Sequence, residues 1–323
     1  MAHWILRLDM RAPEFGAAPA ALYAAALQMA EWADAQGFDE IMLSEHHGSP
    51  DGYLPSPLAM AAAIAARTQR VRIRISALVL PLHDPLRIAE DVAVVDQLSG
   101  GRIELVIVGG FLRGEFELFD RPFERRGRSV EAGLALLERA WSGEPFEHEG
   151  RRIHVTPRPL QRPRPPILLG GSSEHAARRA ARLADGFVPA LPGLYPAYEQ
   201  ACRARGRSPA PDRQLGPGCL HVAEDPDAAW ATLAPHALHE TNSYGRWYAE
   251  GVVTGPYEVM EDADALRAAG SYRVVTPDEC IALARELGDD VWLFVHPLLA
   301  GLDPEEGWKS LELLAAKVLP ALR

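Results

Sequence analysis

The chain has 323 residues, of which 48% are hydrophobic and 24% are charged, so it can bury a sizeable core. Its net charge is −11 at pH 7, and it has no clustered basic tract with which to bind nucleic acid. The three cysteines form no C-x-x-C pair, no apolar run could cross a membrane, and no signal-peptide layout opens the chain. These features predict a cytoplasmic protein with a single domain over residues 1–323.

Short apolar runs predict eight strands, which in chain order are residues 4–8, 39–43, 71–80, 103–108, 167–169, 187–189, 215–222 and 291–295. Most of them lack polar alternation, as is typical of parallel strands that are buried on both faces. Segments with helical periodicity lie between them. This alternation favours an α/β fold, a (β/α)8 TIM barrel, over a doubly wound sheet, for which a G-x-G-x-x-G turn would be expected.

Several helix starts pair a capping side chain with proline, which suits the first helical position: Ser56–Pro57, Asp84–Pro85, Asp225–Pro226, Thr276–Pro277 and Asp303–Pro304. Two joints, "AQGFDEI" at 35–41 and "LADGFVP" at 183–189, predict that a left-handed glycine ends a helix before the next strand.

Two segments interrupt the alternation of strands and helices. Residues 144–166 predict a small hairpin followed by a proline-rich connector. Residues 240–272 lack clear periodicity and are interpreted as an insertion, a mobile lid that closes over a planar ligand. The alternative is an ordered insertion at a subunit interface. Its aromatic residues are Tyr244, Trp247, Tyr248 and Tyr257.

Active sites of such barrels lie at the carboxyl ends of the strands, which makes the residues there candidates. The stretch "LSEHHGS" at 43–49 follows the second strand and contains Glu45, His46 and His47. Other strand ends contribute Ser76, Ala77, His83, Gly109, Gly110, Phe111, Gly170, Gly171, Ser172, Ser173 and His296. The histidines at 148, 154, 175, 236 and 239 are expected to be solvated.

The Gly-Gly-Ser-Ser turn at 170–173 leads into a helix, whose first N–H groups can bind a phosphate. The alternative is an ordinary capped helix start. A metal site is not expected, because adjacent histidines at a strand end rarely bind one ion. A serine hydrolase is not expected either, since G-x-S-x-G is absent.

Four segments together resemble the bacterial luciferase-like monooxygenase family of flavin-dependent barrels. They are "SEHH", "ALVLPLHDPLRIAEDVAVVDQLSGGR", "GGSSEHAARRAARLADGF" and "AGLDPEEGWKSLELLAAKVLPAL". The resemblance implies a monooxygenase in which reduced, dissociable FMN reacts with O2 to a C4a-peroxyflavin that oxidises a small organic substrate. It also implies a separate flavin reductase as partner. Family subunits often pair, and the apolar helix 57–67 predicts a homodimer or a higher homo-oligomer.

The resemblance assigns roles by position. His46 would be the proton donor or acceptor beside the flavin, with Glu45 and His47 orienting it or lining the pocket. A cis peptide bond would join Ser76 and Ala77 beneath the isoalloxazine ring. Backbone along the flavin would come from Val108, Gly109, Gly110 and Phe111, and the phosphate would lie at Gly171, Ser172 and Ser173.

The sequence departs from the family pattern at two positions, and two alternative functions remain open. The luciferase α chain has an arginine at the position of Gly109, for which Arg113 could substitute, and the family has a glutamate at the position of Gly171. One alternative is hydride transfer with an 8-hydroxy-5-deazaflavin coenzyme. The other is a non-catalytic partner subunit, in the manner of the luciferase β chain.

Overall fold

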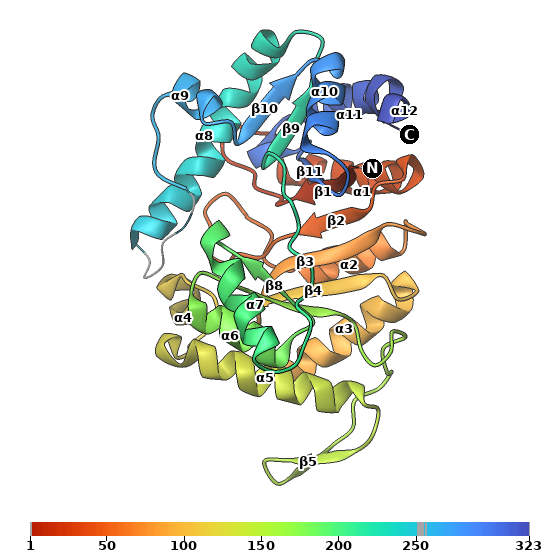
Figure 1. The fold of residues 1–323 in the computed structure, drawn as a ribbon, viewed down its shortest axis with the longest axis vertical. Helices are drawn as coiled ribbons and strands as arrows, with labels where there is room; N and C mark the ends of the chain where they lie inside the picture. The colour runs from red at the N-terminus through yellow and green to blue at the C-terminus, as the bar shows by residue number, and fades with distance from the viewer. Residues whose placement is uncertain (1, 251–254, 256, 323) are drawn as a thin grey trace.

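The computed structural model describes residues 2–250, 255 and 257–322. Its main feature is a nine-stranded sheet in which neighbouring strands are parallel, in the order β10-β9-β11-β1-β2-β3-β4-β7-β8 (Figure 1). The strands are β1 (His3–Leu8), β2 (Glu40–Leu43), β3 (Arg72–Val79), β4 (Ile103–Val108), β7 (Ile167–Gly171), β8 (Gly186–Pro189), β9 (Cys219–Val222), β10 (Tyr272–Val275) and β11 (Trp292–Val295).

Helices alternate with these strands, which confirms the predicted α/β barrel architecture. In the described part of the chain, no hydrogen-bonded strand pair joins β8 to β10. The helices are α1 (Pro19–Gln36), α2 (Pro57–Ala65), α3 (Pro85–Ser99), α4 (Arg113–Leu118), α5 (Arg126–Trp141), α6 (Glu174–Leu183), α7 (Tyr195–Arg203), α8 (Pro226–Glu250), α9 (Ala263–Ala268), α10 (Pro277–Leu287), α11 (Pro304–Leu313) and α12 (Leu319–Leu322). None of the described helices is both long and apolar enough to cross a membrane.

The predicted insertion 240–272 is largely regular structure, so this prediction was wrong in its boundaries. Helix α8 runs on to Glu250, α9 follows, and β10 begins at Tyr272. Pro235 and Gly245 lie inside α8 and weaken its helical signal in the sequence. Residues 251–254 and 256 of the segment lie outside the described residues.

Most local signals gave the correct helix ends. Asp84 accepts hydrogen bonds from the N–H of Leu86 and Arg87, and Thr276 forms a capping box with Glu279. Ser56, by contrast, starts α2 without a side-chain cap.

The two helix-to-strand joints with similar sequences, at 35–41 and 183–189, end their helices differently. Gly37 ends α1 with φ = 85°, as predicted, whereas Ala184 ends α6 and Gly186 opens β8. The predicted hairpin at 144–166 is confirmed as β5 (Phe146–His148) paired with β6 (Arg151–Ile153), and it projects from the body of the molecule (Figure 1).

Candidate active site

The carboxyl ends of β3, β4 and β7 lie side by side, because these strands are neighbours in the sheet. The strands are largely buried, but Val108 at the end of β4 and Gly170 and Gly171 at the end of β7 are half-buried, and in β3 the half-buried residues are Ser76 and Ala77. The peptide bond between Ser76 and Ala77 is cis, as predicted. Strand pairing skips Ala77, since Ser76 pairs with Val106 and Leu78 with Ile107, so the backbone bulges there.

Glycine is required at two of these strand ends. Gly110 has φ = +74°, and a Cβ atom there would lie 2.8 Å from Cγ1 of Val79. A Cβ atom on Gly171 would lie 2.3 Å from Cβ of Ala176, in the first turn of α6. Ser173 caps α6 by accepting from the N–H of Ala176. The turn after β7 therefore presents bare backbone and a helix N-terminus.

His46 lies in the loop after β2 and is 8% exposed. Its Nδ1 atom is 2.8 Å from Oε1 of Glu115, and the same oxygen accepts from the backbone N–H of His47 at 3.0 Å. Glu115 belongs to α4 and is itself buried. The carboxylate that orients His46 is therefore Glu115 rather than the expected Glu45.

Aromatic rings surround His46 from three parts of the chain. Its ring centroid lies 4.5 Å from that of Trp247, 4.8 Å from Tyr53 and 5.8 Å from Phe111. Trp247 is carried by α8, so this helix contributes one side of the site. A pocket walled by rings excludes water from the imidazole.

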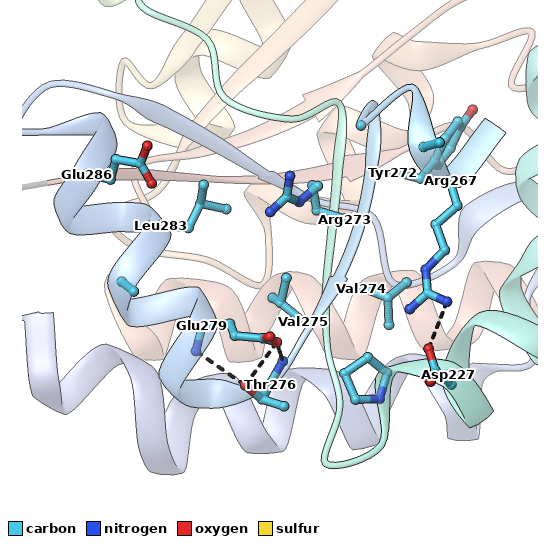
Figure 2. A pocket seen from close by; sticks show the side chains of 14 residues that line it. Asp227, Arg267, Tyr272, Arg273, Val274, Val275, Thr276, Glu279, Leu283 and Glu286 are labelled. Atoms are coloured by element: carbon cyan, nitrogen blue, oxygen red, sulfur yellow. Dashed lines mark hydrogen bonds and ion pairs between the residues drawn. The ribbon is translucent and has the colours of Figure 1, made fainter. Parts of the chain in front are cut away.

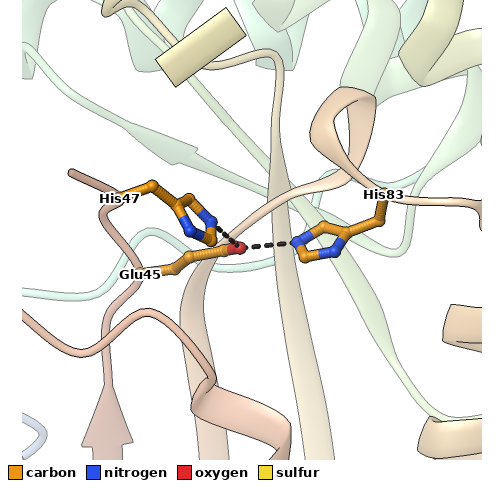
Figure 3. A group of neighbouring side chains, drawn as sticks. All are labelled: Glu45, His47 and His83. Carbon is orange, nitrogen blue, oxygen red and sulfur yellow. Dashed lines mark hydrogen bonds and ion pairs between the residues drawn. The ribbon is translucent and has the colours of Figure 1, made fainter. Parts of the chain in front are cut away.

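Glu45 connects three other groups, of which Figure 3 shows the two histidines. Its carboxylate bonds to Nε2 of His47 at 2.8 Å and of His83 at 2.5 Å, and it accepts from the N–H of Val79 at 2.6 Å. Burial alone would raise the pKa of Glu45, but these hydrogen bonds outweigh it and lower the pKa to about 2. Glu45 thus holds the β2 and β3 loops together. The three side chains also have the composition of a metal site, yet the hydrogen bonds account for their arrangement without an ion.

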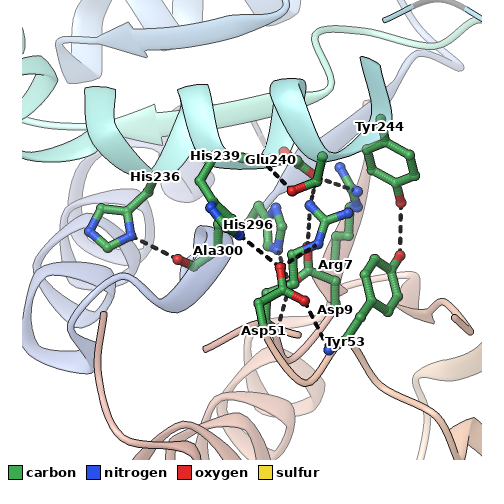
Figure 4. Close-up of polar contacts among 12 residues, drawn as sticks. Arg7, Asp9, Asp51, Tyr53, His236, His239, Glu240, Tyr244, His296 and Ala300 are labelled. Atoms are coloured by element: carbon green, nitrogen blue, oxygen red, sulfur yellow. Dashed lines mark hydrogen bonds and ion pairs between the residues drawn. The ribbon is translucent and has the colours of Figure 1, made fainter. Parts of the chain in front are cut away.

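A buried polar cluster follows β1 and β11 (Figure 4). It joins residues of these strands to α8 and to the loop after β2, and its members include Arg7, Asp9, Arg11, Asp51, Glu240 and His296. Two histidines expected to be solvated take part in this region: His236 is buried and bonds to the backbone oxygen of Ala300, and His239 bonds to Asp51.

Arg113 is not positioned as expected for a phosphate contact, since it pairs with Glu124 at 2.7 Å at the surface. A second arginine is closer to Gly109. The Cγ atom of Arg126 lies 3.7 Å from where a Cβ atom of Gly109 would be. The stem of Arg126 thus covers the position at which the luciferase α chain has an arginine.

A surface groove of about 700 Å³ lies along β10 and α10, away from the predicted residues (Figure 2). Its charged groups are largely paired, since Arg267 bonds to Asp227 and Glu279 bonds to Thr276. None of the predicted site residues lines it. We therefore place the site at the strand ends.

The sequence of the chain matches the model of one protein family, described as luciferase-like monooxygenase, over residues 9–288. The chain belongs to the luciferase-like monooxygenase family. Among curated family relatives, the FMNH2-dependent dimethylsulfone monooxygenase of Pseudomonas putida is 28% identical, over 50% of this chain and 47% of its own. The chain spans about half the length of the first curated relatives that it matches.

Solved structures of luciferase-like proteins share the fold over nearly the whole chain. The monooxygenase RslO1 from Streptomyces bottropensis is 26% identical with a TM-score of 0.78, covering 99% of this chain and 100% of that one. The oxygenating constituent of 3,6-diketocamphane monooxygenase from Pseudomonas putida, in complex with FMN, is 20% identical with a TM-score of 0.73, covering 99% of each chain. An F420-dependent secondary alcohol dehydrogenase is 16% identical with a TM-score of 0.69, covering 100% of each chain.

Sequence reasoning missed Glu115, Tyr53 and Arg11. Glu115 lies in a helix of six residues after β4, and Tyr53 lies within an aperiodic loop. Arg11 lies two residues after a strand-end carboxylate, Asp9, in "LDMR", and its place near a barrel strand end is the one signal that could have identified it.

Proposed function

We propose that the protein is a flavin-dependent monooxygenase that uses reduced FMN and O2 to oxidise a small organic substrate. The observation that carries the proposal is the buried pair of His46 and Glu115 at the carboxyl end of a parallel barrel, inside an aromatic pocket. A buried imidazole with one nitrogen fixed by a carboxylate is equipped to move a proton at the other nitrogen.

The strand ends fit a flavin. The bulged backbone at Ser76 and Ala77 and the half-buried segment from Val108 to Phe111 would lie along a bound ring system. The turn from Gly171 to Ser173, with the N-terminus of α6, would hold the phosphate. Reduced FMN bound there would supply the electrons that allow O2 to react with an organic molecule.

The chain itself supplies proton transfer and exclusion of water. Glu115 fixes the ring of His46 through Nδ1, so Nε2 is left to exchange a proton with the reacting molecules. Trp247, Tyr53 and Phe111 surround the imidazole and keep water from competing. Glu45 and His47 would act as positioning residues, because their hydrogen bonds hold the loop that carries His46.

A separate reductase would deliver the reduced flavin. The dimethylsulfone enzyme is named FMNH2-dependent, and the trigonelline monooxygenase relative is named an oxygenase component. These points favour flavin that binds in reduced form and leaves again.

Titration of the pure protein with FMN, reduced FMN and a reduced deazaflavin, under anaerobic conditions, tests the proposal. We expect reduced FMN to bind most tightly, and O2 admitted to that complex to be consumed more slowly than by free reduced FMN. Tightest binding of the reduced deazaflavin would instead support hydride transfer, the alternative that the fold shared with an F420-dependent dehydrogenase favours. Binding of none of the three would support a non-catalytic role.

A further inference from the structure

Arg11 is fully buried at the carboxyl end of β1, yet it makes no hydrogen bond through its side chain in the described part of the chain. The atoms Nε, Nη1 and Nη2 are all without a hydrogen-bond partner. Buried polar groups in folded proteins are nearly always paired, and a guanidinium carries five donors. An arginine in this state points to an acceptor that is supplied by another molecule.

The charged groups around Arg11 already include three carboxylates, and the histidines His296 and His239 lie beside two of them. Carboxylate oxygens of Asp9, Asp51 and Glu240 each lie 3.7 Å from its nitrogens, and Arg7 bonds to Glu240 at 2.5 Å (Figure 4). Two guanidinium groups thus face three carboxylates. A fourth carboxylate, brought by a ligand, would add negative charge to a buried cluster that already holds three.

A cation does not suit the cluster either. Asp9, Glu240 and His296 place ligand atoms within 4.8 Å of one another, as a metal site would. However, Nη1 of Arg11 lies 3.7 Å from both carboxylates, so a positive group already occupies their surroundings. A neutral acceptor, such as a carbonyl or phenolic oxygen, satisfies the donors without disturbing this balance.

Arg11 also belongs to the aromatic pocket. Its Cζ atom lies 4.5 Å from the ring centroid of Tyr53 and 4.6 Å from that of Tyr244. Trp247, 5.6 Å away, in turn contacts His46 with centroids 4.5 Å apart. An oxygen bonded to Arg11 would therefore belong to a molecule that reaches the neighbourhood of His46.

The rings near this path are nearly parallel. Tyr244 and Tyr257 stack at 18° with centroids 4.9 Å apart, and Phe111 and Tyr248 stack at 20° and 5.1 Å. Tyr248 and Tyr257 differ by only 9°. Parallel rings offer faces on which a flat aromatic molecule can stack by displacing one of them.

We propose that this site recognises an uncharged, planar aromatic molecule, whose carbonyl or phenolic oxygen accepts hydrogen bonds from Arg11 while its ring stacks among Phe111, Tyr244, Tyr248 and Tyr257. The molecule would be the substrate of the reaction proposed above, and in that respect this inference rests on the proposed function. The competing explanation is that Arg11 only balances the three carboxylates and stacks on the tyrosines.

Equilibrium dialysis of the full chain with three matched probes tests the inference. Naphthalene carries no acceptor, 2-acetonaphthone adds a neutral carbonyl, and 2-naphthoate adds a charged carboxylate to the same ring. We expect 2-acetonaphthone to bind ~10-fold more tightly than each of the others, the usual effect of one satisfied bond to a charged donor. Tightest binding of 2-naphthoate, equal binding of naphthalene, or binding of no probe would each overturn the inference.

Arg11→Lys identifies the donor, because an ammonium on a shorter stem stays among the carboxylates and loses the planar fork. The preference for 2-acetonaphthone over naphthalene should disappear. Arg213→Lys is the matched control, since Arg213 also pairs with a carboxylate, Glu40, and stacks on a ring, Trp292, outside the pocket. It should keep the preference, and retained preference in Arg11→Lys would overturn the inference.

Tyr248→Leu keeps the test decisive if Arg11→Lys does not fold. It removes one parallel ring and should weaken binding of all three probes by a similar factor, leaving their order unchanged. Unchanged affinities would overturn the stacking. All dialyses are run anaerobically with and without reduced FMN, so that probe recognition without binding of reduced FMN would refute the monooxygenase proposal and leave the recognition of aromatic molecules standing.

Discussion

The imidazole of His46 and the carboxylate of Glu115 are 69 residues apart in the chain and are joined by a hydrogen bond of 2.8 Å between Nδ1 and Oε1. Oε1 also accepts from the N–H of His47, so it fixes both the ring and the backbone beside it. Oε2 has no hydrogen-bond partner in the described residues. The pair thus defines the orientation in which Nε2 faces the aromatic pocket.

Replacement of His46 by alanine separates catalysis from folding. If His46 moves a proton, product formation by His46→Ala should fall by ~10²–10⁴, while the melting temperature and the affinity for reduced FMN stay nearly unchanged. All three quantities are measured on the same sample. Full turnover with a lowered melting temperature would show that His46 only anchors the loop.

Two substitutions of Glu115 test its role as a positioning residue. Glu115→Gln keeps an oxygen that can accept from Nδ1, whereas Glu115→Leu leaves that atom and the N–H of His47 unpaired. The leucine variant should lose about 1–3 kcal/mol of stability and most of its kcat, with little change in KM. The glutamine variant should recover most of the stability. Equal loss of kcat in both would show that the negative charge, rather than the orientation, matters.

Arg126 is expected to assist the flavin phosphate in place of the arginine that the luciferase α chain has at the position of Gly109. Its guanidinium lies over the ring of Phe123 at 4.1 Å, and its stem covers Gly109. Arg126→Met should weaken binding of reduced FMN ~10-fold, the usual effect of one charged hydrogen bond. Reduced riboflavin lacks the phosphate and should bind both proteins equally. Arg128→Met, at an exposed position on α5, is the control. An equal loss of affinity in that variant would show that any lost positive charge weakens binding, and that Arg126 has no specific role.

Local patterns in the sequence predict eight of the nine strands of the main sheet and the motif around His46, because both depend on neighbouring residues. The partner of His46 could not be predicted in this way. Glu115 lies in the short helix α4, and only the packing of β4 beside β3 brings it to the β2 loop.

Two elements in and around residues 240–272, helix α8 and strand β10, lack a clear signal in the sequence, and the reasons are physical. Helix α8 includes Pro235 and Gly245, both poor helix formers, and packing of buried residues such as Trp230 overrides their propensity. Strand β10 has four residues and follows an aperiodic segment, so it has no pattern of its own. It is stabilised by pairing with β9, which is a tertiary effect.

The stability of the fold should depend on pH through His221 on β9. Burial lowers the pKa of His221 from 6.5 to about 4, which Glu306 offsets only in part. As the pH falls, His221 is therefore protonated first in the unfolded chain. The stability that the neutral, buried His221 allows is fully present above about pH 6.5 and is lost as the pH falls towards 4. A shift of this size corresponds to about 3 kcal/mol.

The free energy of unfolding of His221→Leu, taken relative to that of the wild type, should therefore rise by up to about 3 kcal/mol when the pH is lowered from 7 to 4.5. Denaturant unfolding at the two pH values measures this difference. Glu45 does not interfere, because its pKa is lowered from 4.5 to about 2 and its contribution is lost only below that window. His154→Leu, at an exposed position, is the control. A pH-independent difference between His221→Leu and the wild type would refute the prediction.

A homodimer formed through α2 and α3 is the last prediction. A groove of about 510 Å³ runs between these helices, and Val94 and Leu98, one turn apart on α3, are 45% and 52% exposed. Two large apolar side chains on one helix face, beside the alanine-rich surface of α2, form a patch that a second subunit can cover. Leu98→Glu places a charge in the middle of that contact and should convert the protein to monomers at micromolar concentration. Leu215→Glu, at a leucine that is 57% exposed outside the patch, should leave the dimer intact. Sedimentation velocity distinguishes the species, and a monomeric wild type would disprove the assembly.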